Sequence, residues 1–328
     1  MAHEIDMSNN RANVAYRNEV PWHRLGSKMP ENADIQEWKK TAGLDWEAMV
    51  APLLAQVQIG DEEYDTVECL SNKALIRSDT HDVLSVVSNG YKPVQPSDIM
   101  DFFVDLVDGI DAGFKMETAG SLRGGRKIWA LAKNELGFNI GGNDQVDQYM
   151  LMATSFDRSL PTIALLTSVR VVCANTLHVA AKGREGVRIT HNRKFDPEKT
   201  KEILGISKWQ IFSQQCTKFA DRKMEDDESR RFVAECLATL SPTKDADYYY
   251  DEQEDNDVFK RIWDLRQSAP GQQLDTAKGT LWGDVGAITY YVDHDIKAKS
   301  DDNRLDSQWF GRGARVKNFA YDLASTLV

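Results

Sequence analysis

GFKMETAGSLRGGRKIWALAKN, residues 113–134, contains two strand patterns around one tight turn, and this hairpin sets the prediction of the fold. The two patterns flank Arg123-Gly124-Gly125-Arg126. A Gly-Gly pair supplies the positive φ angles that a tight hairpin turn requires. The segment therefore predicts an antiparallel hairpin from which a sheet extends on both sides.

Neighbouring segments extend this sheet. Downstream, strand patterns cover residues 147–156 and 162–177, and a shorter one covers 183–189. Upstream, residues 64–79 and 81–91 alternate around a polar turn and predict a second hairpin. Most of these strands are neighbours in sequence, so the sheet is expected to be mainly antiparallel.

Helices are predicted before, between and after the strands. Residues 20–55 are expected to form a compact loop and one or two helices, the first of them capped by Asp34 and ended by Gly43. Pro96 starts a second amphipathic helix, and Asp196 starts a third that continues toward Met224. The element order predicts an α+β fold: a bent, mainly antiparallel sheet with hairpins, flanked by helices, with a helical C-terminal part.

The composition divides the chain into four expected parts. Residues 1–20 are polar and are predicted to be a flexible tail, and residues 21–240 form the α+β core domain. Residues 241–257 are predicted to be an acidic loop or linker, and residues 258–328 a helical segment that packs on the core.

The composition also limits the class of protein. With 41% hydrophobic residues, the chain can bury a large core. It has no apolar run long enough to span a membrane and no apolar secretory signal, so a cytoplasmic protein without a membrane partner is expected. The four cysteines are scattered and include no CxxC pair, which favours reduced thiols.

Charge is distributed unevenly along the chain. The formal net charge of −11 argues against a protein that coats nucleic acid over its whole surface. Residues 158–223, however, contain thirteen lysines and arginines against five acids, whereas residues 224–264 contain five against thirteen. This contrast is compatible with a solvated surface, with a basic binding face, or with an acidic strip that imitates a ligand.

Motifs for common catalytic chemistry are missing from the sequence. There is no P-loop, no GxGxxG, no HExxH and no GxSxG, so no cofactor is predicted. Cys173 and His178 lie five residues apart on one predicted strand and would point to opposite faces. Asp293-His294-Asp295 is the best metal-like cluster, but adjacent residues on a helix do not face one another. No catalytic residue and no metal ligand is therefore assigned, although a metal-dependent nuclease or hydrolase stays open as an alternative.

Two cationic segments could bind phosphates. One is the glycine turn at 123–127, where backbone N–H groups and positive charge come together. The other is the basic run at 182–194, in which strand alternation would place Arg188 on a cationic face. Trp129, after the turn, could stack on a base but is expected to be a core residue. The predicted nucleic-acid-binding residues are Arg123, Arg126, Lys127, Arg158, Arg170, Lys182, Arg184, Arg188, His191, Arg193 and Lys194.

Several ordered passages resemble one protein family. They are PWHRLG (21–26), ALIRSDTHDVLSVVSNGYKPVQPSD (74–98), ETAGSLRGGRKIWALA (117–132), SVRVVCANTLHVA (168–180) with RITHN (188–192), and GTLWGDVGAITYYVDH (279–294). Together they look like the DUF932 family, and more narrowly its phage- and plasmid-like members. The resemblance covers roughly residues 20–325 and is most specific in RVVCANTL.

The resemblance implies a protein of phages, prophages and plasmids, and it supplies no catalytic residue. By analogy of element order alone, the chain also resembles single-strand annealing proteins of phages, which bind DNA as oligomeric rings. We therefore expect a non-enzymatic, oligomeric protein that binds nucleic acid, with single-stranded DNA favoured. The alternative is an anti-defence protein that imitates DNA or binds a host protein through its acidic residues 245–257.

Overall fold

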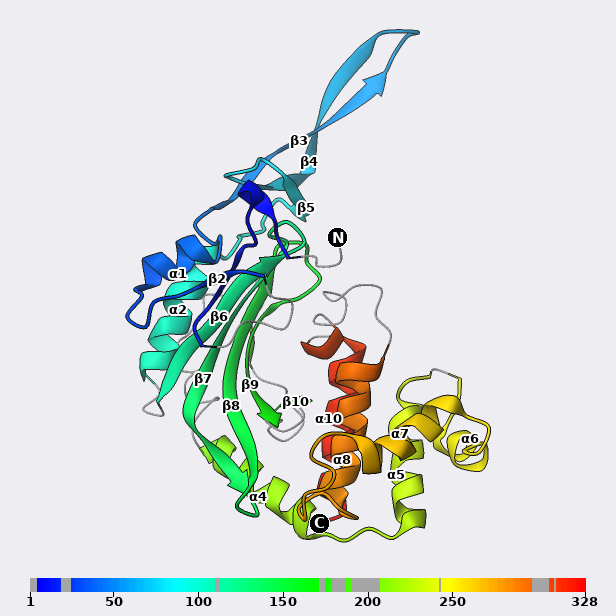
Figure 1. Cartoon of the computed structure of the whole chain (residues 1–328). Helices are drawn as coiled ribbons and strands as arrows, with labels where there is room; N and C mark the ends of the chain where they lie inside the picture. Colours follow the sequence, from blue (N-terminus) through cyan, green and yellow to red (C-terminus); the bar gives the residue numbers. More distant parts are fainter. Residues whose placement is uncertain are drawn as a thin grey trace.

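The structure is a computed structural model, and it describes residues 5–18, 25–109, 113–170, 175–178, 187–189, 207–241, 243–296, 307–309 and 311–328. Its centre is a curved sheet in the order β10–β9–β8–β7–β6–β1–β2, with β11 also paired to β9 (Figure 1). The strands are β1 (Val14–Tyr16), β2 (Ser27–Lys28), β6 (Phe114–Leu122), β7 (Lys127–Ile140), β8 (Asp144–Ser155), β9 (Thr162–Arg170), β10 (Asn175–His178) and β11 (Val187–Ile189). All neighbours are antiparallel except β1 and β2, which confirms the predicted α+β class.

The predicted glycine hairpin is present. Leu122 of β6 pairs with Lys127 of β7, and the turn between them contains Gly124 with φ of 64° and Gly125 with φ of 87°. A Cβ at Gly125 would come within 3.0 Å of the Trp46 ring. This glycine is therefore required both by the backbone conformation and by the close packing of the turn.

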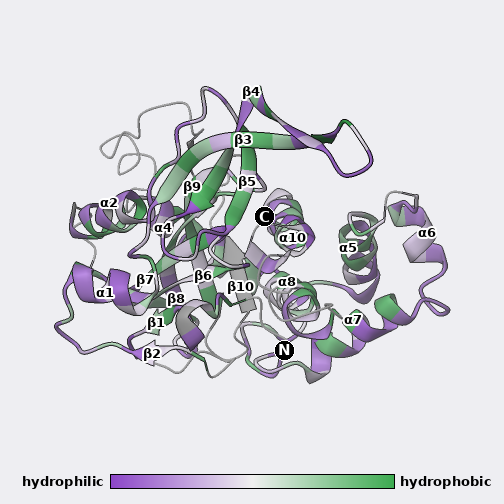
Figure 2. Cartoon of the chain, turned by 90° about the horizontal axis from the view of Figure 1, so that it is seen from above, coloured by the Kyte–Doolittle hydropathy of each residue, from purple (hydrophilic) through white to green (hydrophobic). Residues whose placement is uncertain are grey.

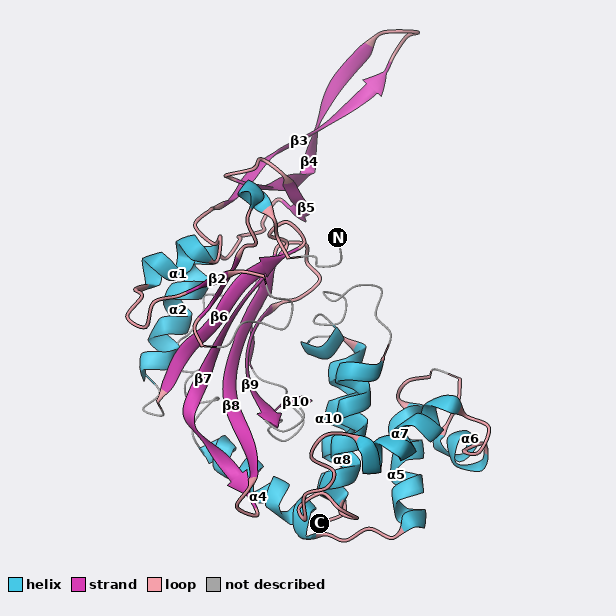
Figure 3. Cartoon of the chain, in the orientation of Figure 1, coloured by secondary structure: helices cyan, strands magenta, loops and turns pink. Residues whose placement is uncertain are grey.

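A smaller sheet adjoins this turn and continues into a long hairpin (Figure 3). It consists of β3 (Ala48–Gln58), β4 (Tyr64–Arg77) and β5 (Val83–Ser88), in that order. The β4–β5 hairpin was predicted. Of the one or two helices expected in residues 20–55, the described residues contain one, at Ile35–Thr41, because the end of this segment belongs to strand β3. The apolar run of β3 fits either structure by composition. Pro52, which cannot donate to a ladder, is tolerated because β3 is an edge strand.

Two helices cover one face of the larger sheet. Helix α1 (Ile35–Thr41) begins at a capping box, in which the Asp34 side chain accepts from the backbone of Glu37 at 2.9 Å. Helix α2 (Pro96–Gly109) buries Met100 and Phe103 completely. It contacts β6, β7 and β8, so its apolar side faces the sheet. Both predicted helix starts are confirmed.

The N-terminal segment is part of the sheet, so the prediction of a flexible tail was wrong for residues 5–18. A short 3-10 helix, η1 (Ser8–Asn10), precedes β1, which pairs with β6 through Val14 and Gly120. Ile5 and Val14 are buried, and the buried Asp6 forms an ion pair with Arg77. Buried contacts and ladder hydrogen bonds thus order a segment whose composition is polar.

The C-terminal part of the chain is helical, as predicted. Its elements are α4 (Ser207–Asp221), α5 (Asp226–Ala238), α6 (Ala246–Asp251), α7 (Asp257–Ser268), α8 (Leu281–Tyr290), the π-helical turn η2 (Tyr291–Asp295) and α10 (Arg312–Thr326). The predicted start of the long helix at Asp196 lies outside the described residues. The expected acidic loop contains helix α6, which Asp245 caps at the backbone N–H of Tyr248 and which buries Tyr249.

Helices and sheet share one hydrophobic core. The same cluster of buried side chains contains Ile128 and Leu166 from strands and Leu281 and Val285 from α8. At its edge, the buried carboxylate of Asp144 at the start of β8 accepts from the Trp282 indole at 3.0 Å and from the Thr276 hydroxyl at 2.8 Å. These bonds fix the C-terminal helices to one end of the sheet.

Candidate functional site

Two turns meet at one end of the larger sheet and bring three predicted arginines together. The β6–β7 turn contains Arg123 and Arg126, and the β8–β9 turn contains Arg158. The backbone N–H of Phe156 donates to the carbonyl of Arg126 at 2.7 Å, which fixes the two turns side by side. We call this end of the sheet, defined by Arg123, Arg126 and Arg158, the arginine end.

Arg123 and Arg158 adopt a backbone conformation that is uncommon for residues with side chains. Their φ angles are 55° and 66°. Residues other than glycine enter this left-handed region at a cost of about 1 kcal/mol or more. The side chain of Arg158 is exposed and that of Arg123 is half-buried, so both strained positions present cations near the same surface.

Arg126 also has a structural role. Its guanidinium donates to the carbonyls of Val83 and Leu84, both at 3.2 Å, and so joins β5 to the glycine hairpin. Its neighbour Lys127 was predicted to bind phosphate, but Lys127 is only 5% exposed. Strand alternation turns this side chain into the body of the protein. We therefore remove Lys127 from the candidate interface.

The register of β9 separates two other predicted residues. Arg188 of β11 lies opposite Ile163, close to the β8–β9 turn, so its backbone belongs to the arginine end. Arg170 lies at the far end of β9, opposite Val146. The structure describes only the backbone of these two arginines. The remaining predicted residues lie outside the described ranges: Lys182, Arg184, His191, Arg193 and Lys194.

A separate charged groove crosses strands β1, β6 and β7. It has a volume of about 370 Å³ and is lined by Arg17, Asn18, Glu31, Lys115, Glu117, Lys133 and Glu135. Lys115 and Glu135 form an ion pair across its mouth at 2.5 Å. Deeper in the groove, the amide of Asn18 donates to the Glu117 carboxylate at 2.7 Å.

Burial perturbs the ionisable groups of this groove. It raises the pKa of Glu117, because the hydrogen bond from Asn18 only partly compensates for desolvation. For Lys133, the opposing effect of burial is outweighed by a bond to Asp147 at 2.6 Å, so the pKa of Lys133 is raised. Burial also raises the pKa of Tyr149 to about 12. The groove thus combines a carboxyl that accepts a proton readily with a firmly charged lysine.

The groove was not predicted, although the sequence contains a signal for it. Each strand of the predicted hairpin contains a lysine and a glutamate spaced two residues apart: Lys115 and Glu117 on one strand, and Lys133 and Glu135 on the other. Side chains two residues apart share a face of a strand. The hairpin register places Lys115 opposite Lys133, and β8 adds Tyr149 opposite Lys133.

The two aspartates of the metal-like cluster at 293–295 form ion pairs with basic side chains of the same protein. Asp293 pairs with Lys317 at 2.6 Å, and Asp295 pairs with Arg261. Among the residues that the structure describes, no group of three His, Cys, Asp or Glu side chains is placed to hold a metal ion. A metal-dependent activity built on Asp293 would have to displace its ammonium partner.

Trp129 is a core residue, as predicted. It is 5% exposed, and its ring lies 6.3 Å from that of Trp309 in an edge-to-face contact. It is therefore not presented for stacking on a base.

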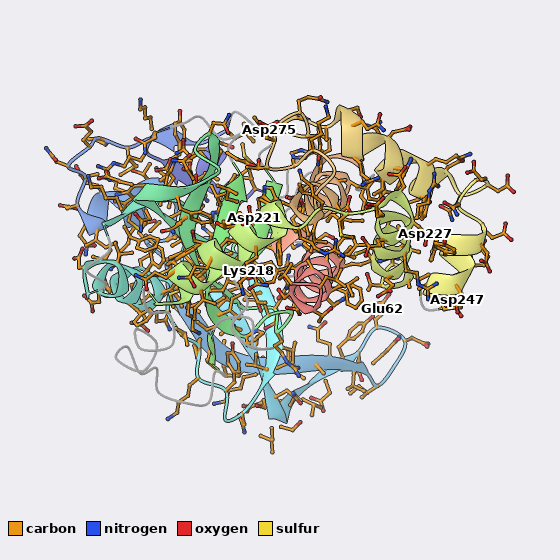
Figure 4. The ribbon with its side chains drawn as sticks, turned by 90° about the horizontal axis from the view of Figure 1, so that it is seen from below. Glu62, Lys218, Asp221, Asp227, Asp247 and Asp275 are labelled. Carbon is orange, nitrogen blue, oxygen red and sulfur yellow. The ribbon has the colours of Figure 1, made fainter. Side chains whose placement is uncertain are left out.

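Helices α5, α6 and α7 form a folded acidic unit (Figure 4). Asp227 of α5 accepts from the Tyr250 hydroxyl, and Asp247 of α6 pairs with Arg231 at 2.7 Å. The other exposed acids of this unit include Asp251, Glu252, Glu254 and Asp255. Negative charge is thus displayed on these helices and on the turn between α6 and α7.

The fold and the site define an α+β protein with a curved sheet, a cationic sheet end and an acidic helical unit. A family model described as "Domain of unknown function (DUF932)" matches residues 83–309, and the chain belongs to this family. No curated protein matches the chain, and no solved structure matches it. No helix within the described ranges is long and apolar enough to cross a membrane.

Proposed function

We propose that this chain binds single-stranded nucleic acid through the arginine end, as a non-enzymatic protein of phages, prophages or plasmids that acts in annealing or recombination. The observation that carries the proposal is the register of the sheet. It brings the two arginine-bearing turns together and adds the backbone of Arg188 from the basic run. Backbone phosphates are bound by such clusters without reading of sequence.

The uneven charge supports this surface. The whole chain is acidic, with a net charge of −11, yet residues 158–223 contain thirteen cations against five acids. Strands β9 and β11, which border the arginine end, belong to this basic region. A local cationic face on an acidic protein binds phosphates while general adhesion to nucleic acid stays weak.

The first test measures the binding of a labelled oligothymidylate by fluorescence anisotropy over a salt series. The variant is Arg123→Gln with Arg158→Gln, because glutamine removes the positive charge, keeps a polar side chain and does not relieve the positive φ. We expect weaker binding and a salt dependence that is shallower by about 0.7 for each arginine that neutralises a phosphate.

The control is Lys260→Gln with Arg261→Gln on α7, which changes the net charge equally at another surface. It should bind like the unmodified protein. Absence of binding at low salt, or equal losses in both double variants, would contradict the proposal.

A second candidate function rests on the acidic helical unit. Its exposed carboxylates lie on folded helices and on the turn between α6 and α7, as in a protein that imitates nucleic acid and occupies a basic host protein. Deleting residues 245–257 would remove the buried Tyr249 and damage the fold, so amide substitutions are the better test.

For this candidate, the unmodified chain should displace DNA from a basic, sequence-independent DNA-binding protein. Replacing Asp251, Glu252, Glu254 and Asp255 by their amides should weaken the displacement, whereas Asp105→Asn with Asp108→Asn on α2 should not. If the unmodified chain leaves the DNA complex intact in a gel-shift assay, this candidate function is excluded.

A further inference from the structure

The β3–β4 hairpin extends beyond the three-stranded sheet as a projecting arm (Figure 1). Strand β5 pairs only with Asn72–Ile76 of β4, so the arm, residues 54–68, has two strands and two open edges. Two-stranded hairpins are marginally stable in water when nothing covers them. Long open edges also invite pairing with another chain. The arm therefore has the geometry of a segment that is completed by a partner.

One face of the arm carries exposed apolar side chains, interrupted by the exposed Asp65 opposite Val57. Val57 lies near the end of β3, and Ile59, just after the strand, continues the same face, since alternate residues of an extended chain share a face. Their exposed fractions are 46% and 65%, and that of Val67, opposite Ala55 on this face, is 49%. Figure 2 shows the hydrophobic colouring of β3.

The same side continues onto the three-stranded sheet. Met49 lies on the same face of β3 as Val57, and Ile76 and Val83 are aligned with it across the sheet. Met49 is 40% exposed and Val83 is 51% exposed. On the opposite face Leu75 is fully buried, and its partner Val50 on the edge strand is 40% exposed. We call this surface the apolar arm face: Met49, Ala51, Ala55, Val57, Ile59, Val67, Ile76, Val83 and Val86. An exposed apolar surface of this extent marks an interaction site.

The distribution of charge on the arm and at its base indicates which partner the arm binds. Residues 48–72 contain five acids and no lysine or arginine, and three of the acids, Asp61, Glu62 and Glu63, are at the tip. The base of the arm adjoins the arginine end, because Arg126 donates to the carbonyls of β5. An antiparallel crossing of two arms would therefore place each acidic tip against the arginines of the other copy.

We propose that the arm is a dimerisation surface, on which two copies of this chain pack their apolar arm faces together with the arms antiparallel. The contact is a two-layer β-sandwich in which the same surface is used by both copies, as two-fold symmetry requires. Apolar side chains make up most of its centre, where Asp65 lies beside Val57, and the acid–arginine contacts form its two ends. Arg158 belongs both to this contact and to the proposed nucleic-acid surface, so dimer and nucleic acid compete for it.

The first test is sedimentation equilibrium of the full chain. The variant is Val57→Thr with Ile59→Thr and Val67→Thr, because threonine keeps the β-branch and strand preference while adding a hydroxyl to the face. The control is Leu54→Thr with Leu70→Thr, two residues that are 59% and 75% exposed away from the apolar arm face.

The unmodified chain should be a dimer, and the triple variant should dissociate with a Kd at least about tenfold higher. The control should match the unmodified chain, and equal far-ultraviolet circular dichroism should show that all three proteins are folded. A monomer at every concentration, or an oligomer that the triple variant leaves intact, overturns the proposal.

A charge exchange tests the antiparallel arrangement. Glu62→Arg at the tip and Arg158→Glu at the base should each weaken the dimer, and the two together should restore it. If the combined variant is no tighter than either single one, the antiparallel contact is wrong. Neither measurement contains nucleic acid, so the dimer is tested independently of the function proposed above.

Discussion

Replacing Lys317 by methionine should lower the free energy of unfolding by about 3–5 kcal/mol. Lys317 lies on α10 and its ammonium is 2.6 Å from the Asp293 carboxylate of η2, with side chains that are 1% and 2% exposed. Burial lowers the pKa of Lys317 despite this contact, which shows how strongly the site disfavours an isolated charge. Methionine fills the space but removes the ammonium group that pairs with the buried Asp293 carboxylate.

Two controls separate the ion pair from packing. Lys317→Met with Asp293→Leu removes both charges and should recover most of the lost stability, since a buried pair can be replaced by apolar groups at little cost. Lys260→Met breaks the exposed Lys260–Asp257 pair on α7 and should change stability by less than about 1 kcal/mol. Urea denaturation at neutral pH measures all three variants. If the Lys317 variant is as stable as the Lys260 variant, the buried pair is not required for folding.

Replacing Arg77 by methionine should also cost about 3–5 kcal/mol. Arg77 is fully buried and donates to Asp79 at 2.6 and 2.9 Å and to Asp6. Its guanidinium lies 4.8 Å from the centre of the Trp46 ring. It thereby joins the N-terminal segment, the base of the arm and the core. With methionine at position 77, the buried Asp6 carboxylate would keep its hydrogen bonds from Asn13 and Ser121 but would lose the guanidinium of Arg77.

The pH dependence of this effect follows from Asp6. Burial alone would raise its pKa, but bonds from Ser8, Arg77 and Asn13 hold the pKa of Asp6 below its ordinary value of 3.8. An acid with a lowered pKa stabilises the fold above its unfolded-state pKa, and this stabilisation is lost as pH falls through the folded-state value. Without Arg77 the pKa of Asp6 should rise.

The stability difference between the Arg77→Met variant and the unmodified protein should therefore shrink as the pH is lowered from 7 to below about 4. Guanidinium denaturation at the two pH values measures it. A difference that does not depend on pH would mean that Arg77 acts through packing on Trp46 rather than through the charge of Asp6.

Local signals predicted much of the fold. Asp34 followed by Glu37 specified the start of α1, and Gly124-Gly125 specified the hairpin, because caps and tight turns depend on a few adjacent residues. Helix α6 was missed because one and a half turns of helix in an acidic segment are held by tertiary packing of Tyr249. Its intrinsic preference alone would not stabilise so short a helix.

Part of the candidate site could not be predicted, because it depends on pairing between strands and turns that are far apart in the sequence. The turn that contains Arg123 and Arg126 was predicted, but the burial of Lys127 depends on which side of the hairpin faces the body. The arginine end exists because the β8–β9 turn lies beside the β6–β7 turn, a contact between Phe156 and Arg126 that no local pattern encodes. The charged groove likewise depends on the register of three strands.

The pairing of β1 with β6 affects the order in which the chain can fold. Val14 pairs with Gly120, and Asp6 accepts hydrogen bonds from Arg77 and Ser121, so residues 6–14 have their partners far downstream in the sequence. The meander from β6 to β9 pairs neighbours and can form early, whereas contacts of high sequence separation form slowly. During synthesis, β1 therefore stays unpaired with β6 until residues near 120 have emerged from the ribosome. Its docking adds β1 to the edge of β6 and completes the buried charge network around Arg77.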